Sequence, residues 1–461
     1  MDVKTGSKPG RHIERLADFA ACFNYKDISD EVAQQAKLVL LDTLGVILAA
    51  SLERYSAARI VTEFVRALGG APESTIIGRD FKTSCVNAAL ANGTLGYYAD
   101  MEPFHRGSIV HAAAVVVPSS LAVGEREGAD GKQLLAAIVL GIDVACRVSY
   151  ALDPRALYQR GFHPSAVAGC FGATAAAGNL LGLDGPQIQN AFGLAGTQAS
   201  GLLAWVSDYT ENSRPFNMGI TARNGVTSAL LARMGFGGAP DIFEGKYDLF
   251  TAFSGERHLN ELTDGLGKRF SIMEMAFKLY SCVGWLPPGL DGLLSIVDEQ
   301  KLAFEQVAQI TLRIAESGVP IIDNNELKSH CAQYILPIGL LNRRVTIDDI
   351  LQDRRTDPRI QALSEHVYVV GDAELEKTFP DLRRTIVEVV TNDGKRFVRQ
   401  VDYPKGYPEN PLTQAEVEGK FLDMATSALS LRQAEKIVAL VKTIERVANI
   451  EELAGTLRIE S

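Results

Sequence analysis

The fold is set by a stretch that reads Gly161-Phe162-His163-Pro164-Ser165-Ala166, followed by Gly169-Cys170-Phe171-Gly172-Ala173-Thr174-Ala175-Ala176-Ala177. Its glycines and alanines permit close helix packing, and proline or serine suits a helix start. We therefore expect His163 at a helix N-terminus, where the helix dipole lowers the pKa of an imidazole and free backbone N–H groups attract anions. Such a place suits carboxylate binding or proton transfer. The alternative is a histidine that only caps a buried helix.

Length and composition narrow the class of protein. A chain of 461 residues is too long for one compact core, so two domains are expected. Hydrophobic residues make up 46% of the chain and charged residues 22%, which is typical of a globular protein. The net charge is −10 and no basic block is present, which argues against a nucleic-acid partner. The sign of a small substrate stays open.

The cysteines and the N-terminus predict a cytoplasmic protein. Six cysteines occur singly, without a CxxC motif or the spacing of a zinc site. We therefore expect a reducing, cytoplasmic environment. Residues 1–15 are polar and carry four basic side chains but no apolar core, so we expect neither a signal peptide nor membrane association.

Helical patterns fill the chain up to about residue 260. Apolar residues recur at helix spacing within residues 13–50, and Ser29 offers a cap for the second half of that segment. Further helices rich in small residues are expected at 57–68, 131–151, 170–181, 186–203 and 219–234, with a polar loop over 205–217. Almost no strand pattern interrupts them, which predicts an all-α first domain over residues 1–265.

Two polar features interrupt these apolar helices. Asp42 lies inside the apolar run 38–50, so it needs buried partners and belongs either to a structural network or to a site. Residues 97–111 form the densest titratable cluster in the chain, and His111 then opens a helix over 112–123. No HxH or HxxxH pair lies on one helix face, so the prediction is that no metal binds there.

The pattern changes after residue 265. Residues 309–316 alternate as a strand, and the strands 385–391 and 396–401 flank Asn392-Asp393-Gly394-Lys395, which predicts a hairpin. With helices at 287–300 and 329–341, residues 266–404 are expected to form a smaller α/β domain. Residues 405–461 are helical and should return to the first domain. The predicted fold class is therefore mainly α.

Several short motifs, in this order and spacing, resemble one known family. They are Leu41-Asp42-Thr43-Leu44-Gly45, Gly161-Phe162-His163-Pro164-Ser165-Ala166, Phe171-Gly172-Ala173, Leu180-Leu181-Gly182-Leu183, Gly196-Thr197-Gln198-Ala199-Ser200-Gly201 and Phe243-Glu244-Gly245. Together they make the chain similar, over nearly its whole length, to the MmgE/PrpD family. That family includes 2-methylcitrate dehydratases, cis-aconitate decarboxylases and iminodisuccinate epimerase.

The resemblance implies a helical domain, an α/β lid and a site in the cleft between them, in a homodimer without metal or organic cofactor. It also implies catalytic roles for His163 in the Gly-Phe-His motif and for His111 at the helix start after the acidic loop. Lys278, in Lys278-Leu279-Tyr280-Ser281-Cys282, matches the family's lysine, and Tyr334, in His330-Cys331-Ala332-Gln333-Tyr334, matches its lid tyrosine.

The chain departs from the family pattern in two motifs. The usual Asp-Phe-Asp-Asp-Thr-His loop reads Asp100-Met101-Glu102-Pro103-Phe104-His105, so Asp100 is the best candidate for its acid and His105 is a further substrate-binding candidate. The usual Lys/Arg-x-Leu-His-x-Gly reads Arg214-Pro215-Phe216-Asn217-Met218-Gly219. Arg214 keeps the cation, whereas Asn217 can bind a substrate but cannot shuttle a proton.

These groups suit removal of a proton next to a carboxylate of a small anionic substrate. Arg214 can bind a carboxylate through paired hydrogen bonds, and a neutral imidazole or a lysine of lowered pKa can take the proton. Lys278, Tyr334 and helix amides would stabilise the negative charge. Because a histidine is lost at position 217 and the acidic loop is rewritten, we expect an epimerase, resembling iminodisuccinate epimerase. The alternatives are a hydro-lyase acting on a citrate-like tricarboxylate, a decarboxylase, or a scaffold without activity.

Overall fold

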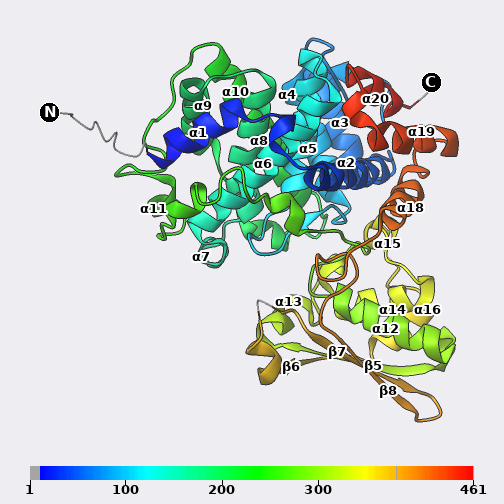
Figure 1. The fold of residues 1–461 in the computed structure, drawn as a ribbon. Helices are drawn as coiled ribbons and strands as arrows, with labels where there is room; N and C mark the ends of the chain where they lie inside the picture. The colour runs from blue at the N-terminus through cyan, green and yellow to red at the C-terminus, as the bar shows by residue number, and fades with distance from the viewer. Residues whose placement is uncertain (1–10, 353, 380–381, 460–461) are drawn as a thin grey trace.

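A computed structural model describes residues 11–352, 354–379 and 382–459. The first ten residues, which belong to the segment where the sequence predicts neither a signal peptide nor membrane association, lie outside the described range. The described residues form two large hydrophobic cores. We call the larger one, with the elements around it, the helical part, and the smaller one the α/β part (Figure 1).

The helical part contains the elements up to β4 and the last three helices. Its helices are α1 (His12–Cys22), α2 (Asp30–Ala50), α3 (Ser56–Leu68), α4 (Cys85–Tyr98), α5 (Ala112–Glu127), α6 (Gly131–Leu152), α7 (Pro154–Gln159), α8 (Pro164–Leu180), α9 (Gly185–Gln198), α10 (Ser213–Arg233), α11 (Leu249–Phe253), α18 (Gln414–Ala425), α19 (Leu431–Lys442) and α20 (Glu451–Thr456). Two short antiparallel ladders join β1 (Ser74–Thr75) to β2 (Lys82–Thr83) and β3 (Phe104–His105) to β4 (Met275–Ala276).

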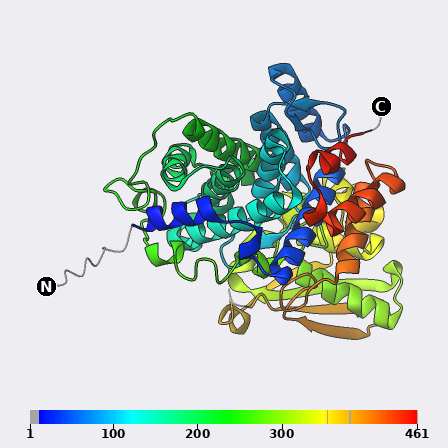
Figure 2. The same ribbon diagram turned by 45° about the horizontal axis from the view of Figure 1, so that its top comes forward.

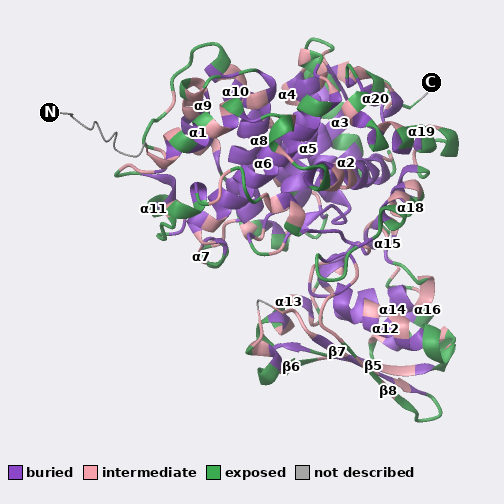
Figure 3. Ribbon diagram, viewed as in Figure 1, coloured by how far each residue is buried: buried purple, intermediate pink, exposed green. Residues whose placement is uncertain are grey.

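Helix α8 lies at the centre of the helical part, packed against α5, α6, α9 and α10. Almost all of its residues are buried, and Figure 3 shows the same for its neighbours α5 and α6. The small residues are needed for this packing, because a Cβ atom on Gly172 would lie 2.5 Å from the carbonyl oxygen of Gly141. The role predicted for the glycine- and alanine-rich stretch, close helix packing, is confirmed.

Helices α2 and α6 are the most apolar long helices of the described chain. By length and composition either could cross a membrane, but 83% of the apolar window of α2 and 94% of that of α6 are buried inside the protein. Both therefore act as core helices in this structure. Ser29 caps α2 through a hydrogen bond from the backbone N–H of Val32, as the sequence predicts.

The α/β part is built on one mixed sheet of four strands, in the order β6-β5-β7-β8. Strand β5 pairs in parallel with β6 and antiparallel with β7, which forms the predicted hairpin with β8. Figure 1 shows α12, α14 and α16 together on one face of the sheet. The elements are α12 (Pro287–Gln300), β5 (Val307–Ala315), α13 (Val319–Ile322), α14 (Ala332–Asn342), α15 (Ile347–Leu351), α16 (Pro358–Ser364), β6 (Val367–Asp372), α17 (Ala373–Glu376), β7 (Thr385–Thr391) and β8 (Arg396–Val401).

The C-terminal helices pack against the helical part, as expected. Helix α18 lies against α2, and Figure 2 shows the orange and red helices beside the blue and cyan ones. Lys420 of α18 forms a buried ion pair with Asp42 at 2.8 Å and donates to the backbone oxygen of Met101. Of the two roles left open for Asp42, the structural network is the one observed, and it supports the loop that begins at Asp100.

Helix α10 begins earlier than the sequence predicts. Residues 205–217 were expected to form a loop, but the helix starts at Ser213. The carboxylate of Asp208 accepts hydrogen bonds from the backbone N–H and the hydroxyl of Ser213, and so satisfies polar groups at this helix end. The missed helix start places Arg214 in the first turn of α10.

Candidate active site

Two helix starts meet at the centre of the candidate site. His111 is the N-cap residue of α5 and His163 is the N-cap residue of α8. The backbone N–H of His111 donates to the hydroxyl of Ser165 at 3.0 Å, which holds the two helix ends together. As a result, the two imidazole rings have centroids 6.3 Å apart. Residues that are 52 positions apart in the sequence thus face the same region.

A buried cluster of charges lies beside these rings. Asp100 follows α4 with a φ of 52°, a left-handed conformation that aspartate tolerates better than most residues. Its carboxylate pairs with the ammonium group of Lys278 and lies 3.8 Å from the guanidinium of Arg214. Lys278 reaches this place because it follows β4, which pairs with β3 in the loop after Asp100. All three side chains are buried.

The pKa values of this cluster follow from opposing effects. Burial by itself would raise the pKa of Asp100, but the charges of Lys278 and Arg214 outweigh it and lower the value to about 2. Burial would likewise lower the pKa of Lys278, but Asp100 reverses the direction and raises it. Lys278 is therefore a cation at neutral pH. The prediction of a lysine with a lowered pKa that could take a proton is wrong, because the sequence did not reveal its carboxylate partner.

Glu102 and His111 form a second pair, with Oε1 and Nδ1 2.5 Å apart. Burial raises the pKa of Glu102 to about 8, and the nearby Asp100 carboxylate adds to the effect. Burial and the charge of Lys278 lower the pKa of His111 to about 3. At neutral pH the carboxyl group of Glu102 is thus protonated and can donate to Nδ1, which leaves the proton of the neutral His111 ring on Nε2.

His163 is neutral as well. Its pKa is lowered to about 3, chiefly by burial and then by His111 and Arg214. The predicted direction is confirmed, but burial is the main cause in place of the helix dipole. Nδ1 of His163 and Nε1 of Trp205 are buried without a hydrogen-bond partner among the described residues, and the two rings have centroids 5.8 Å apart. Buried polar atoms are normally hydrogen-bonded, so both atoms indicate a site for a polar ligand.

Two expected site residues lie elsewhere in the structure. Tyr334 is buried in the core of the α/β part, where its hydroxyl donates to the backbone oxygen of Asp349. His105 is next to Phe104 in β3, so the two side chains point to opposite sides of the strand. Phe104 stacks on His111 with centroids 5.4 Å apart, whereas His105 contacts Ser108 and Glu274. The structure does not bring Tyr334 or His105 to the charge cluster.

Asn217 lies at the edge of the site. It follows Arg214 by one turn of α10, its side chain is partly exposed, and its amide donates to the backbone oxygen of Leu202 at 3.5 Å. Arg214 itself is held by the backbone oxygens of Tyr97 and Tyr98, and its guanidinium lies over the Tyr97 ring. Because Asn217 follows Arg214 by three residues on α10, it lies near the charge cluster. No described contact joins its side chain to the cluster.

Several residues of the site were absent from the sequence prediction, namely Glu102, Trp205, Glu211 and His330. Glu211 lies 3.4 Å from Nε of Arg214 and accepts a hydrogen bond from Ser329 at 2.9 Å. His330, next to Ser329, contacts Trp205 with ring centroids 6.2 Å apart. The motif that was matched for Tyr334 also contains His330, so the right segment was identified but its histidine was overlooked.

The trio Asp100, Glu102 and His111 offers ligand atoms within 4.8 Å of one another, the kind of group that could hold a metal ion. However, Lys278 already pairs with Asp100, and Arg214 adds a second positive charge. A divalent cation would be repelled by both. The charges of this site therefore favour an anionic ligand over a cation.

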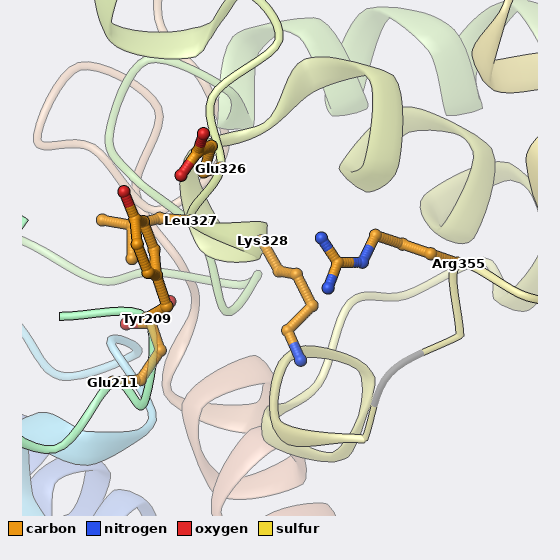
Figure 4. Close-up of a pocket in the computed structure, with 6 residues that line it drawn as sticks. All are labelled: Tyr209, Glu211, Glu326, Leu327, Lys328 and Arg355. Carbon is orange, nitrogen blue, oxygen red and sulfur yellow. The ribbon is translucent and has the colours of Figure 1, made fainter. Parts of the chain in front are cut away.

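A cavity of about 370 Å³ lies next to the cluster, between the loop before α10 and the α/β part. Figure 4 shows Tyr209 and Glu211 on one side, and Lys328 and Arg355 on the other. Glu326 and Leu327 complete the lining. Glu211 is shared with the charge cluster through its ion pair with Arg214, so the cavity and the cluster adjoin one another.

Comparison with protein families identifies two matching models. The model described as "MmgE/PrpD N-terminal domain" matches residues 14–262, and the model described as "MmgE/PrpD C-terminal domain" matches residues 280–446. The first match alone covers more than half of the chain.

Curated relatives match the chain over most of its length. The cis-aconitate decarboxylase-like protein oryM of Aspergillus oryzae is 27% identical, with 99% of each chain covered. The cis-aconitate decarboxylase of Mus musculus is 24% identical, with 94% of this chain and 90% of the relative covered. The mitochondrial 2-methylcitrate dehydratase of Yarrowia lipolytica is 25% identical, with 93% of this chain and 86% of the relative covered.

Proposed function

The chain belongs to the MmgE/PrpD family, and from this premise we propose that it is a cofactor-independent lyase that acts on a small polycarboxylate. The observation that carries the proposal is the buried cluster in which Asp100 faces two cations beside neutral imidazoles. A dehydratase and a decarboxylase are both lyases, and the relatives described above carry these names. The proposal replaces the epimerase expected from the sequence, which these names do not support.

The charges support an anionic substrate. Lys278 and Arg214 carry two positive charges, and Asp100 and Glu211 supply the negative charges in contact with them. Nε of Arg214 nevertheless has no hydrogen-bond partner among the described residues, so a substrate carboxylate could bind there. Lys328 and Arg355, which line the adjoining cavity, would attract a polycarboxylate to the same region. The α/β part supplies both residues, which supports a role for it as a lid over the site.

The protonation states support proton transfer next to a carboxylate. Neutral imidazoles can take or give a proton at neutral pH, and the ammonium group of Lys278 can stabilise negative charge that develops on the substrate. Glu102, with a pKa raised to about 8, holds a proton in the site. That proton could pass through His111 to a departing hydroxyl group.

Dehydration of a citrate-like hydroxy acid is therefore the leading reaction. The sequence argument against it was that the loss of a histidine at position 217 and the rewritten acidic loop remove groups that a dehydratase would keep. The loop nevertheless buries two acids, Asp100 and Glu102, in opposite protonation states. Such a pair suits an enzyme that must both bind a charged substrate and protonate a leaving group.

Decarboxylation of an aconitate-like acid is the second candidate. It is favoured by the names of the relatives from Aspergillus oryzae and Mus musculus, a cis-aconitate decarboxylase-like protein and a cis-aconitate decarboxylase. Both reactions require charge stabilisation by a cation and a proton donor near the reacting carbon. The two reactions therefore use the same catalytic groups and differ only in the substrate bond that breaks.

Proton NMR in deuterium oxide distinguishes these reactions. The purified enzyme is incubated with 2-methylcitrate, citrate, cis-aconitate and iminodisuccinate in separate samples. New vinyl signals from a hydroxy acid would support the dehydratase, and conversion of the vinyl signal of cis-aconitate into those of a product that has lost carbon dioxide would support the decarboxylase. Exchange of the α-proton with inversion and no other product would contradict the lyase proposal, as would the absence of turnover with all four acids.

A further inference from the structure

The short 3₁₀ turn Lys328–His330 of the α/β part reaches the candidate site. His330 is buried and contacts Trp205, whose other neighbour is His163. The charges of Asp100, Glu211, Arg214 and Lys278 all act on the His330 ring. The α/β part thus contributes a third imidazole to a site whose other two come from the helical part.

The hydrogen bonds fix the tautomer of His330. Ser329 Oγ lies 2.9 Å from Glu211 Oε1 and also 2.9 Å from His330 Nδ1. A hydroxyl has one proton to donate, and a carboxylate beside Arg214 can only accept it. The contact with His330 must then be a donation from Nδ1–H to the serine oxygen. The neutral ring therefore keeps a bare Nε2, and no described residue donates to that atom.

A second buried histidine has the opposite arrangement. His105 Nδ1 also lies 2.9 Å from a serine hydroxyl, that of Ser108, but it additionally accepts the backbone N–H of Ser108 at 3.1 Å. Its proton is therefore on Nε2, which lies 3.3 Å from the carboxylate of Glu274. Because a backbone N–H can only donate a hydrogen bond, Nδ1 of His105 must be the acceptor. The tautomer of His105 is therefore as firmly set as that of His330. His105 offers a matched control outside the site.

We propose that His330 is the general base of this active site, and that Ser329 and Glu211 orient it. The proposal rests on the proposed lyase function and assigns one of its proton transfers. His111, which carries its proton on Nε2, faces the substrate as a donor from the helical part. His330, which has a bare Nε2, faces it as an acceptor from the α/β part.

In a dehydration, the proton balance is complete. Nε2 of His330 takes the proton from the carbon next to a carboxylate, and the C–H electron pair forms the new double bond as the C–O bond breaks. The departing hydroxyl takes the Nε2 proton of His111, which is replaced on Nδ1 by the proton of Glu102. The products are water and an unsaturated acid. After release, the Nδ1 proton of His111 returns to Glu102, and the proton held by His330 returns through solvent to Nε2 of His111.

The first test is chemical rescue. His330→Ala should lower kcat by at least about 100-fold with the substrate found by NMR, because a general base contributes this much or more. Imidazole added to the solution should restore at least about a tenth of the lost turnover, and the restored rate should rise with the fraction of free imidazole base. His105→Ala should keep kcat within about threefold and should not respond to imidazole.

The second test examines the orienting serine. Ser329→Ala should lower kcat by about tenfold to 100-fold with KM changed less, because a residue that orients a catalytic imidazole fixes its tautomer. Ser108→Ala, which removes the equivalent hydroxyl next to His105, should leave kcat unchanged. If the two serine variants have equal effects, or if Ser329→Ala is fully active, the proposal that Ser329 orients His330 is overturned.

The outcomes separate this inference from the proposed function. If the wild-type protein turns over no polycarboxylate, the lyase proposal itself fails. If the wild type is active and His330→Ala keeps its kcat, the lyase proposal stands and the role of His330 is wrong. If His330→Ala is folded by circular dichroism, inactive and not rescued by imidazole, His330 is structural and the inference is overturned.

Discussion

Two buried ion clusters in the helical part differ in how completely their polar atoms are paired. On α6, Asp143 and Arg147 form an ion pair at 2.6 Å. Arg147 also donates to the backbone oxygens of Glu261 and Asp264, and Asp143 accepts from the backbone N–H and hydroxyl of Ser271. Among the described residues, neither side chain of this pair has a buried polar atom without a partner.

The polar atoms of the cluster around Asp100 are less completely paired than those of the α6 network. Nε of Arg214, Nδ1 of His163 and Nε1 of Trp205 have no hydrogen-bond partner among the described residues. Burial of charge is thus common to both regions and does not by itself indicate function. What distinguishes the candidate site from the α6 network is this group of buried polar atoms without a protein partner, which a ligand could satisfy.

The largest expected effect concerns His163. His163→Ala should lower kcat by about 10³-fold, because its buried imidazole lies beside the reacting groups and a positioned polar group that stabilises charge on the substrate contributes on the order of 10²–10³-fold. The free energy of unfolding should fall by only about 1 kcal/mol, since the variant loses ring packing but no hydrogen bond to Nδ1. Steady-state kinetics and urea unfolding check both statements. A variant with wild-type kcat would remove His163 from the site.

Arg147→Met should give the opposite result. Removal of one partner from a buried ion pair leaves the other charge unpaired, so the free energy of unfolding should fall by about 3 kcal/mol. The kcat of the folded enzyme should stay at the wild-type value, because this network lies outside the charge cluster. Loss of activity in a variant that is still folded would show that the α6 network is not purely structural.

Glu102→Gln should change the pH dependence of the free energy of unfolding. Burial raises the pKa of Glu102 to about 8 from its ordinary value of 4.5, so its favourable contribution to stability is fully present below about pH 4.5. That contribution is lost as the pH rises towards 8. The stability of the variant relative to wild type should therefore increase between pH 5 and 8, by up to about 1.4 kcal/mol per pH unit.

The same variant should lose activity. Glutamine cannot pass a proton to His111, so kcat should fall by about 100-fold, and the fall in wild-type activity expected above about pH 8 should be absent. Urea unfolding and rate profiles measured over the same pH range test both effects. An unchanged pH–rate profile would exclude Glu102 as the proton source.

Lys328→Gln should have a smaller effect, on substrate capture. Loss of one cation at the cavity should raise KM by about threefold with kcat unchanged, since Lys328 is partly exposed and charge interactions near the surface contribute about 0.2–1 kcal/mol. Lys395→Gln, in the turn between β7 and β8, is the matched control and should leave KM unchanged. The difference between the two should decrease at high salt. Equal KM values of Lys328→Gln and Lys395→Gln at low salt would argue against substrate capture at this cavity.

His105→Asn should have the smallest effect on activity. The side chain points away from His111 and contacts Ser108 and Glu274, so kcat and KM should stay within about twofold of wild type while stability falls by about 1 kcal/mol. Kinetics together with urea unfolding check the result. A large rise in KM would restore the substrate-binding role that the sequence predicts for this residue.

Local signals in the sequence predicted much of the fold. The hairpin of β7 and β8 and the bounds of α12 agree with the prediction, because turn residues and apolar periodicity act over a few positions. Strand β6 was missed, although its run Val367-Tyr368-Val369-Val370 is rich in the β-branched and aromatic residues typical of strands. The homodimer, the cytoplasmic location and the boundaries of the domains stay predictions.

The sequence by itself determined that His111 and His163 stand at helix starts and which motifs carry the family resemblance, because caps, turns and helix periods depend on neighbours in the chain. Only the tertiary structure decided that Lys278 is charged, that Glu102 holds a proton, and that His330 reaches the site while Tyr334 does not. Those properties depend on burial and on charges brought from distant segments. The protonation state of a side chain depends on the burial, charges and hydrogen bonds around it in space. Most of the residues that supply them here are more than a hundred positions away in the sequence.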